Sequence, residues 1–302
     1  MVRKEILLCV ISVYFLIGSS GCKEEAVTAD PTGTAEYTQI DFEPSLTGDS
    51  QNLLYVHSDV DYELSGIYLH DFSNNKDSMI IPGLAQCPEW SPDKKWIVYS
   101  INSLLIKSKS NGDSQTVIAN TGLNFFPHWS PDGSKIAYSE TSCGNSETCG
   151  IYVMNPDGEN KTLIESKANF PAWKDSGNVL IYLKPLTENY GIRYGDSLIE
   201  YNLNDKFRKG LALFNGDANK INSYLSYSGN EVFFSSVSKT GYSYIYKYSI
   251  DDKTLTRLTS SQGISPETTF YSDKIIYTNR NPGNGRLWIM NKDGSNAAQL
   301  IY

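Results

Sequence analysis

The acidic side chains of two near-identical phrases are the first candidates for chemistry in this sequence. Asp93 lies in "WSPDKKWIVY", which starts at Trp90, and Asp132 lies in "WSPDGSKIAY", which starts at Trp129. A carboxylate at either position could act as a general acid or bind a metal ion. An aspartate in Ser-Pro-Asp-Gly, however, also accepts hydrogen bonds from nearby backbone N–H groups and fixes a turn. Because the residue recurs together with its turn, we interpret both aspartates as structural.

Other catalytic arrangements find little support. The three histidines, His57, His70 and His128, fall in different repeats, so no multi-histidine metal site is predicted. The G-x-S-x-G elbow of serine hydrolases does not occur. Carboxylate pairs for glycoside hydrolysis are defined by distance in space, so they stay open as an alternative. The acids to consider for such a pair are Asp59, Asp61, Glu63 and Glu89. We predict neither a cofactor nor a bound metal.

The two phrases belong to a sixfold repeat, and its units are the elements that must position any site. Each unit has an apolar run that closes on an aromatic residue, at spacings of 39 to 52 residues: Tyr55, Tyr99, Tyr138, Tyr182, Phe234 and Tyr277. A second alternating run, a turn cluster such as Pro-Asp-Gly and a short apolar run follow each copy. Four short strands in a unit of this length indicate a propeller blade. We therefore predict an all-β, six-bladed β-propeller with four antiparallel strands per blade.

Prolines indicate which strand is innermost. Four copies carry a proline two residues before the large residue that opens the phrase: Pro44, Pro88, Pro127 and Pro171. Proline cannot donate to a ladder and is confined to strand edges or starts. The innermost strand of a blade has such an edge, facing the central channel. The large residue at the phrase start would then pack between neighbouring blades. Since the first and the last unit each contain all four strands, a strand-swapped closure of the ring is not required.

The repeat resembles that of TolB-type propellers, W-S-P-D-G-x-x-I-A-Y followed by I-Y-x-M-x-x-D-G. The third unit matches almost letter for letter in "WSPDGSKIAY" and "IYVMNPDG", and the resemblance extends over residues 40–302. It implies the propeller fold and, because propellers of this type dock partners over the channel mouth, a binding role. TolB carries an α/β domain before its propeller, whereas only a short polar stretch precedes the first unit here. Its full role therefore cannot simply be transferred.

Antiparallel strands sort the connections of the predicted blades between two ends. With strands lettered a to d from the axis outward, the regular a–b and c–d turns share one end. The b–c loops and the crossings between blades share the other, and variable loops on a rigid scaffold are where binding usually resides. Ordinary packing or a solvated loop is the alternative for each residue there. The candidates for the binding face are Glu89, Phe126, His128, Phe170, Tyr190, Arg193, Tyr194, Tyr242 and Arg280.

The beginning of the chain predicts export and anchoring. Residues 1–21 combine Arg3 and Lys4 with an apolar run and small residues, as a signal peptide does, and they end before Cys22. This resembles a bacterial lipoprotein signal, although Ser19 stands where that motif prefers leucine. We predict lipidation of Cys22, a flexible tether over residues 22–39 and the propeller over 40–302. Lys23 is not the aspartate that retains lipoproteins at the inner membrane, so we predict the outer membrane, facing the periplasm or the cell surface.

The remaining cysteines and the charge complete the prediction. Cys143 and Cys149 bracket one loop and could form a disulfide in an oxidising compartment, while Cys87 is expected to be buried. A formal net charge of −8 argues against a nucleic-acid partner. We predict a non-enzymatic envelope lipoprotein that binds a protein, peptide or glycan through the variable-loop face. The alternative is a carbohydrate-active enzyme, a glycoside hydrolase or lyase, with acids on that face. A structural component that assembles through its outer rim is a third reading.

Overall fold

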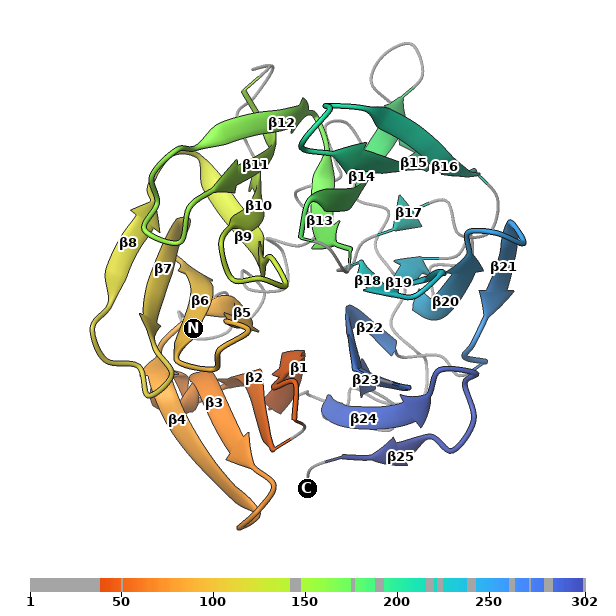
Figure 1. The fold of residues 1–302 in the computed structure, drawn as a ribbon. Helices are drawn as coiled ribbons and strands as arrows, with labels where there is room; N and C mark the ends of the chain where they lie inside the picture. The colour runs from red at the N-terminus through yellow and green to blue at the C-terminus, as the bar shows by residue number, and fades with distance from the viewer. Residues whose placement is uncertain are drawn as a thin grey trace, which may run out of the picture.

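Six antiparallel sheets stand around a central axis in the computed structural model, five with four strands and one, blade 5, whose innermost strand is in two pieces (Figure 1). It describes residues 39–49, 51–141, 148–174, 177–187, 193–215, 220–221, 225–237, 243–260, 264–271, 273–279 and 285–300. The prediction of a six-bladed propeller with four antiparallel strands per blade is confirmed. The described residues contain only one short 3₁₀ helix, η1 (Tyr62–Leu64), which follows the second strand.

The first three blades are formed by strands that are consecutive in the sequence. Blade 1 contains β1 (Gln39–Leu46), β2 (Asn52–Asp59), β3 (Gly66–Asp71) and β4 (Lys76–Pro82). Blade 2 contains β5 (Gln86–Trp90), β6 (Trp96–Ile101), β7 (Leu104–Lys109) and β8 (Thr116–Ala119). Blade 3 contains β9 (Leu123–Trp129), β10 (Ile136–Thr141), β11 (Gly150–Met154) and β12 (Thr162–Ser166).

The last three blades follow the same order, with one irregularity in blade 5. Blade 4 contains β13 (Asn169–Trp173), β14 (Val179–Thr187), β15 (Arg193–Asn202) and β16 (Arg208–Phe214). In blade 5 two short pieces, β17 (Lys220–Ile221) and β18 (Ser226–Ser228), both pair with β19 (Glu231–Val237), so the innermost strand is split; β20 (Ser243–Ser249) and β21 (Thr254–Arg257) follow. Blade 6 contains β22 (Ile264–Tyr271), β23 (Lys274–Asn279), β24 (Arg286–Asn291) and β25 (Ala298–Gln299).

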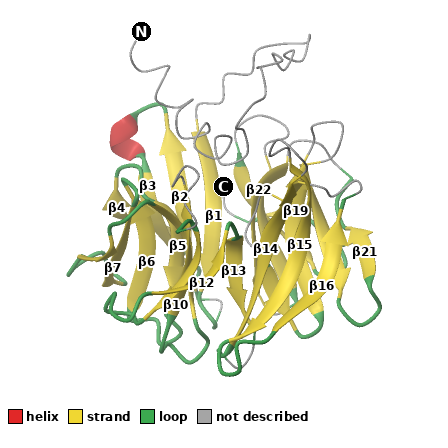
Figure 2. Ribbon diagram, turned by 90° about the horizontal axis from the view of Figure 1, so that it is seen from above, coloured by secondary structure: helices red, strands yellow, loops and turns green. Residues whose placement is uncertain are grey.

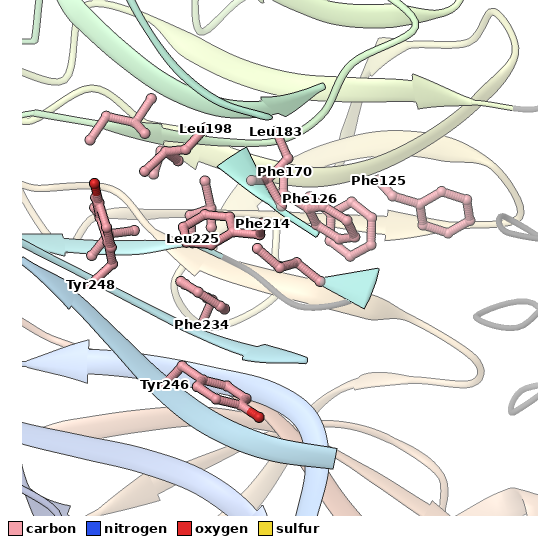
Figure 3. Packing of buried hydrophobic residues seen from close by; sticks show 14 of the residues in the cluster. Phe125, Phe126, Phe170, Leu183, Leu198, Phe214, Leu225, Phe234, Tyr246 and Tyr248 are labelled. Atoms are coloured by element: carbon pink, nitrogen blue, oxygen red, sulfur yellow. The ribbon is translucent and has the colours of Figure 1, made fainter. Parts of the chain in front are cut away.

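The hydrophobic core is divided among the borders between blades. Trp90 of β5 packs against β2 of blade 1, Trp129 of β9 against β6 and β7 of blade 2, and Trp173 of β13 against β10 and β11 of blade 3. The tryptophan that starts the phrase in blades 2, 3 and 4 therefore packs between neighbouring blades, as the sequence predicts. Between blades 3, 4 and 5 the core is rich in phenylalanine, and Figure 3 shows Phe126, Phe170, Phe214 and Phe234 there.

The innermost strands of blades 1 to 4 are bulged immediately before their prolines. Glu43, Cys87, Phe126 and Phe170 have φ angles of 51°, 56°, 55° and 57°, and the ladder to the second strand shifts register at each of these points. A bulge leaves an extra residue out of the ladder, and proline, which has no N–H to donate, suits that place. The residues after the prolines, Ser45, Glu89, His128 and Ala172, consequently occupy equivalent positions.

The aspartates of the repeated phrase hold the turns in place. Asp132 accepts hydrogen bonds from Ser130 Oγ at 2.6 Å and from the backbone N–H of Ser134 at 2.9 Å. Asp93 accepts in the same way from Ser91 Oγ and from the backbone N–H of Lys95. The hydrogen bonds from Ser130 and Ser134 lower the pKa of Asp132 to about 2. These contacts are the structural role that the sequence predicts for the two aspartates.

The ring closes without exchange of strands, because blades 1 and 6 are each complete. Among the described residues, a parallel bridge between Ile40 and Gly285 joins the backbones of the two blades. Asp41 donates its backbone N–H to the Gly285 carbonyl at 3.1 Å and accepts at its own carbonyl from Thr278 Oγ1 at 3.0 Å. Ring closure therefore depends on contacts of β1 with β22, β23 and β24, and on the packing of Leu53 and Tyr55 of β2 against Ile276 and Leu287 of blade 6.

The two ends of the propeller differ in their connections. Figure 2 shows η1 at one end, near the start of β3, and regular green hairpin turns at the other. We call the end with η1 the variable-loop end and the other the hairpin-turn end. β1 also begins at the variable-loop end, since Gln39 pairs with Asp59, the last residue of β2. Within the described part of the chain, no helix has the length and hydrophobicity needed to cross a membrane.

Candidate functional site

Three polar side chains meet on the innermost strands of blades 1, 2 and 3. Ser45 Oγ donates a hydrogen bond to Glu89 Oε2 at 3.3 Å, and His128 Nδ1 lies 3.6 Å from Glu89 Oε1. The side chains of Glu89 and His128 are 26% and 18% exposed, so both keep some contact with solvent. The equivalent residue of blade 4, Ala172, is buried and apolar. The structure thus brings together two of the residues that the sequence proposed, Glu89 and His128.

Burial sets the protonation of this polar trio. It raises the pKa of Glu89 to about 8, against the smaller opposing effect of the hydrogen bond from Ser45. It lowers the pKa of His128 to about 4. At neutral pH the Glu89 carboxyl is therefore protonated and the His128 imidazole is neutral, and their 3.6 Å separation exceeds that of a hydrogen bond. The trio offers uncharged donors and acceptors rather than an ion pair.

The bulges separate this trio from the variable-loop end. Glu89 and His128 follow the bulges, on the side nearer the hairpin turns, and Cys87 and Phe126 at the bulges are buried. The Cys87 backbone N–H donates to Glu43 Oε2 across the border between blades 1 and 2. These buried residues lie in a layer between the trio and the variable loops on the first blades of the ring.

Two of the predicted binding residues lie in that layer. The rings of Phe126 and Phe170 are buried, and their centroids are 4.6 Å apart across the border between blades 3 and 4 (Figure 3). In this structure they contact the core instead of presenting a surface to a partner. The packing alternative that the sequence left open therefore describes both phenylalanines.

A second polar cluster lies at the variable-loop end, where blades 1 and 6 meet. Asp41 Oδ1 lies 2.6 Å from His57 Nδ1, and Arg286 Nη1 donates to Asp41 Oδ2 at 3.2 Å. Asp59 Oδ2 is 3.7 Å from the other ring nitrogen of His57. Burial alone would lower the pKa of His57, but the hydrogen bond and charge of Asp41, together with Asp59, outweigh it and raise that pKa. The cluster stabilises ring closure.

The sequence pointed to Asp59 but not to Asp41 or Arg286. A weak signal for Asp41 exists in the sequence, because this charged residue lies between the apolar residues Ile40 and Phe42. The equivalent residues of the next two blades, Ala85 and Asn124, carry no charge. Nothing in the local sequence around Arg286 indicates its partner, which lies 245 positions away.

The other predicted residues are not tested by the described part of the chain. Cys22, Cys143, Tyr190, Tyr242 and Arg280 lie outside it, and Arg193 and Tyr194 belong to β15 without a described side chain. Cys149 takes part in a disulfide, but because Cys143 lies outside the described residues the pairing of the two stays a prediction. Cys87 is buried, as expected. Among the described residues, no group of three or more His, Cys, Asp or Glu side chains is placed to hold a metal ion.

A pocket at the hairpin-turn end lies between the Ser-Pro-Asp turns of blades 2 and 3. Trp96, Lys107, Trp129 and the two turn aspartates line it. The Lys107 Nζ lies 4.9 Å from the centre of the Trp96 ring and so covers one aromatic face. Since the carboxylates already accept hydrogen bonds within their own turns, we assign this pocket no ligand.

Comparison with known proteins supports the fold. The structure is similar to that of a putative TolB from Agrobacterium tumefaciens, with a TM-score of 0.58 and 20% identity over 75% of this chain and 84% of that one. TolB from Acinetobacter baumannii gives a TM-score of 0.64 and 18% identity over 89% of this chain, which spans 64% of that protein. An oligogalacturonate lyase in complex with manganese gives 0.57 and 12% identity, with 85% and 91% of the two chains covered.

No protein-family model matches the chain, and neither does any curated protein sequence. The structural likenesses show a six-bladed propeller fold like that of TolB proteins. At these levels of identity they establish the fold, while activity and partners have to be argued from the site.

Proposed function

We propose that this protein is a non-enzymatic binding module of the bacterial envelope, which binds a protein, peptide or glycan at the variable-loop end. The observation that carries the proposal is the difference between the two ends. At the hairpin-turn end the turn aspartates repeat, and Asp93, Asp132 and Asp293 accept hydrogen bonds within their own turns. At the variable-loop end the connections differ from blade to blade, and blade 1 adds η1 with exposed apolar side chains.

The anchoring proposal fits the position of the first strand. Lipidation at Cys22 would tether the propeller to the outer membrane, and the chain would reach β1 at the variable-loop end. The 16 residues 23–38 span at most about 55 Å when fully extended. A partner at that end would therefore lie close to the membrane. Cys22→Ser should release the protein from the membrane fraction, and protease shaving of intact cells should show on which side the domain lies.

A pull-down from envelope extracts tests the binding role. One variant has residues 188–192, between β14 and β15, replaced by glycines. The matched control has residues 203–206, in the turn at the opposite end of the same blade, replaced in the same way. We expect a partner that wild type and control retain and the loop variant loses. Equal retention by all three proteins would contradict the proposal.

A carbohydrate-active enzyme is the second candidate, and Glu89 is the observation that favours it. A glutamate with a pKa of about 8 is protonated at neutral pH, as a general acid must be. Its described contacts, however, are Ser45 and His128 rather than a second carboxylate. Release of reducing or unsaturated sugars from polysaccharides by wild type but not by Glu89→Gln would favour the enzyme.

A further inference from the structure

Exposed apolar side chains are concentrated in one loop of blade 1. Val60, Tyr62 and Leu64 are 53%, 51% and 48% exposed and lie within five residues, between β2 and β3. The other large exposed apolar residues among those described are spread singly over the outer strands and turns: Met79, Val117, Leu163, Phe207, Leu213 and Leu255. Single exposed apolar residues are ordinary, whereas a cluster indicates an interaction surface. We call residues 60–64 the blade-1 loop.

The blade-1 loop is held in one conformation by its own hydrogen bonds. The backbone N–H of Asp61 donates to Asp59 Oδ1 at 2.7 Å, and that of Leu64 donates to the Asp61 carbonyl at 3.0 Å. From β3, Tyr68 Oη donates to the Leu64 carbonyl at 2.8 Å. The apolar side chains are thus displayed on an ordered backbone, and a partner would not bear the cost of ordering it.

The charges in the blade-1 loop select the chemistry of that partner. Asp61 and Glu63 alternate with the apolar residues, and both are exposed. No ion pair among the described residues involves either carboxylate. A complementary surface would carry cations between apolar side chains. An anionic membrane surface would be repelled by the two carboxylates.

The tether of this chain does not complement the charge of the blade-1 loop. Residues 23–38, which connect Cys22 to β1, contain four acidic residues and one lysine. Like charges would oppose their docking on Asp61 and Glu63. A second copy of this acidic chain is disfavoured on the same ground, given its formal net charge of −8.

From these observations we propose that the blade-1 loop docks a basic peptide segment in which lysine or arginine alternates with apolar residues. The inference rests on the proposed binding role of the variable-loop end and names the class of partner for it. Val60, Tyr62 and Leu64 supply the apolar contact, and Asp61 and Glu63 pair with the cations. The expected partner is a membrane-proximal protein with a segment in which basic and apolar residues alternate.

Fluorescence anisotropy with a defined probe tests the proposal. The probe is a labelled octapeptide in which lysine alternates with leucine or valine, and the control peptide carries glutamate in place of lysine. The purified mature protein should bind the basic peptide, more weakly as salt rises, and not the acidic one. Tyr62→Ser with Leu64→Ser should raise the dissociation constant for the basic peptide by about tenfold or more, because two apolar contacts are lost.

Two further variants keep the outcome interpretable. Asp61→Asn with Glu63→Gln retains the shape of the loop and should weaken binding by about threefold to tenfold while flattening the salt dependence. Phe207→Ser with Leu213→Ser removes two exposed apolar residues of blade 4 and should change binding by less than about twofold. Circular dichroism and melting curves establish that each variant is folded.

Several results would overturn the proposal. They are an unchanged dissociation constant for both loop variants, equal binding of the acidic peptide, or loop-dependent binding of phosphatidylcholine–phosphatidylglycerol vesicles without binding of the peptide. Loop-dependent self-association in sedimentation, or cross-linking of the loop to residues 23–38, would assign the surface to this chain itself and overturn it too. If the blade-1 loop variants bind the basic peptide as wild type does, this inference fails. The proposed function still stands if the pull-down partner is lost on replacement of residues 188–192 but kept on replacement of residues 203–206.

Discussion

The two ends of the propeller differ in how closely their connections repeat from blade to blade. At the hairpin-turn end the same turn recurs, with an aspartate that accepts from a serine and a backbone N–H in its own turn, as Asp132 does. At the variable-loop end the side chains differ between blades, and some, such as Tyr62, are about half exposed. Repetition therefore indicates residues that serve the fold, and departures from it indicate residues that are free to serve a partner. The predictions below test this division, beginning with the largest expected effect.

Trp129→Ala should cause the largest loss of stability. Trp129 is buried between blades 2 and 3, and removing its side chain leaves a cavity there. We expect the free energy of unfolding in urea to fall by about 3–4 kcal/mol. Partner binding per folded molecule should be unchanged, because the residue repeats and serves the fold. A loss of binding with intact stability would break the division between the ends.

Asp41→Asn should lower stability by about 2 kcal/mol, because it leaves Arg286 and His57 without the carboxylate between them. The loss should be larger at pH 6 than at pH 9. A histidine with a raised folded pKa adds stability below its unfolded pKa, and this contribution fades as pH rises through the folded value.

Asp49→Asn is the matched control for the Asp41 experiment. It removes one partner of the exposed ion pair between Asp49 and Lys94, and it should cost much less stability than Asp41→Asn, because solvent screens an exposed pair. Equal losses for the two variants, measured by urea unfolding, would contradict a special role of Asp41 in closing the ring.

Glu89→Gln should have a smaller, pH-dependent effect. Because the folded pKa of about 8 lies above the unfolded value of 4.5, the folded wild type holds an extra proton between these values and loses stability as pH rises through them. The variant lacks this dependence, so relative to wild type it should gain about 1–2 kcal/mol between pH 5 and pH 9, after allowance for partial solvent access. His128 remains in both proteins, so its own titration largely cancels. Parallel pH profiles of the two unfolding free energies would show that Glu89 titrates normally.

The features that the sequence predicted correctly depend on local pattern. The spacing of the phrases gave the six blades, and the tryptophans at their starts mark the borders between blades. The turn role of Asp132 followed from its four-residue context. Glu89 and His128 were both candidates for the binding face, and the structure shows that the two side chains are neighbours.

The features that the sequence did not predict depend on contacts between blades. A residue before proline favours extended backbone, yet Phe126 and Phe170 adopt positive φ and turn into the core, because packing between blades outweighs the local preference. The contact of Asp41 with Arg286 joins residues 245 positions apart and exists only once the ring has closed. No local pattern carries that information.

The most direct test of the binding role uses a partner that the envelope pull-down has identified. Calorimetry then measures its affinity for two variants of the same blade. With residues 188–192 replaced by glycines the dissociation constant should rise at least tenfold, while replacement of residues 203–206 at the opposite end should change it less than twofold. A partner that binds both variants equally, or that loses affinity only for the hairpin-turn variant, would contradict the account.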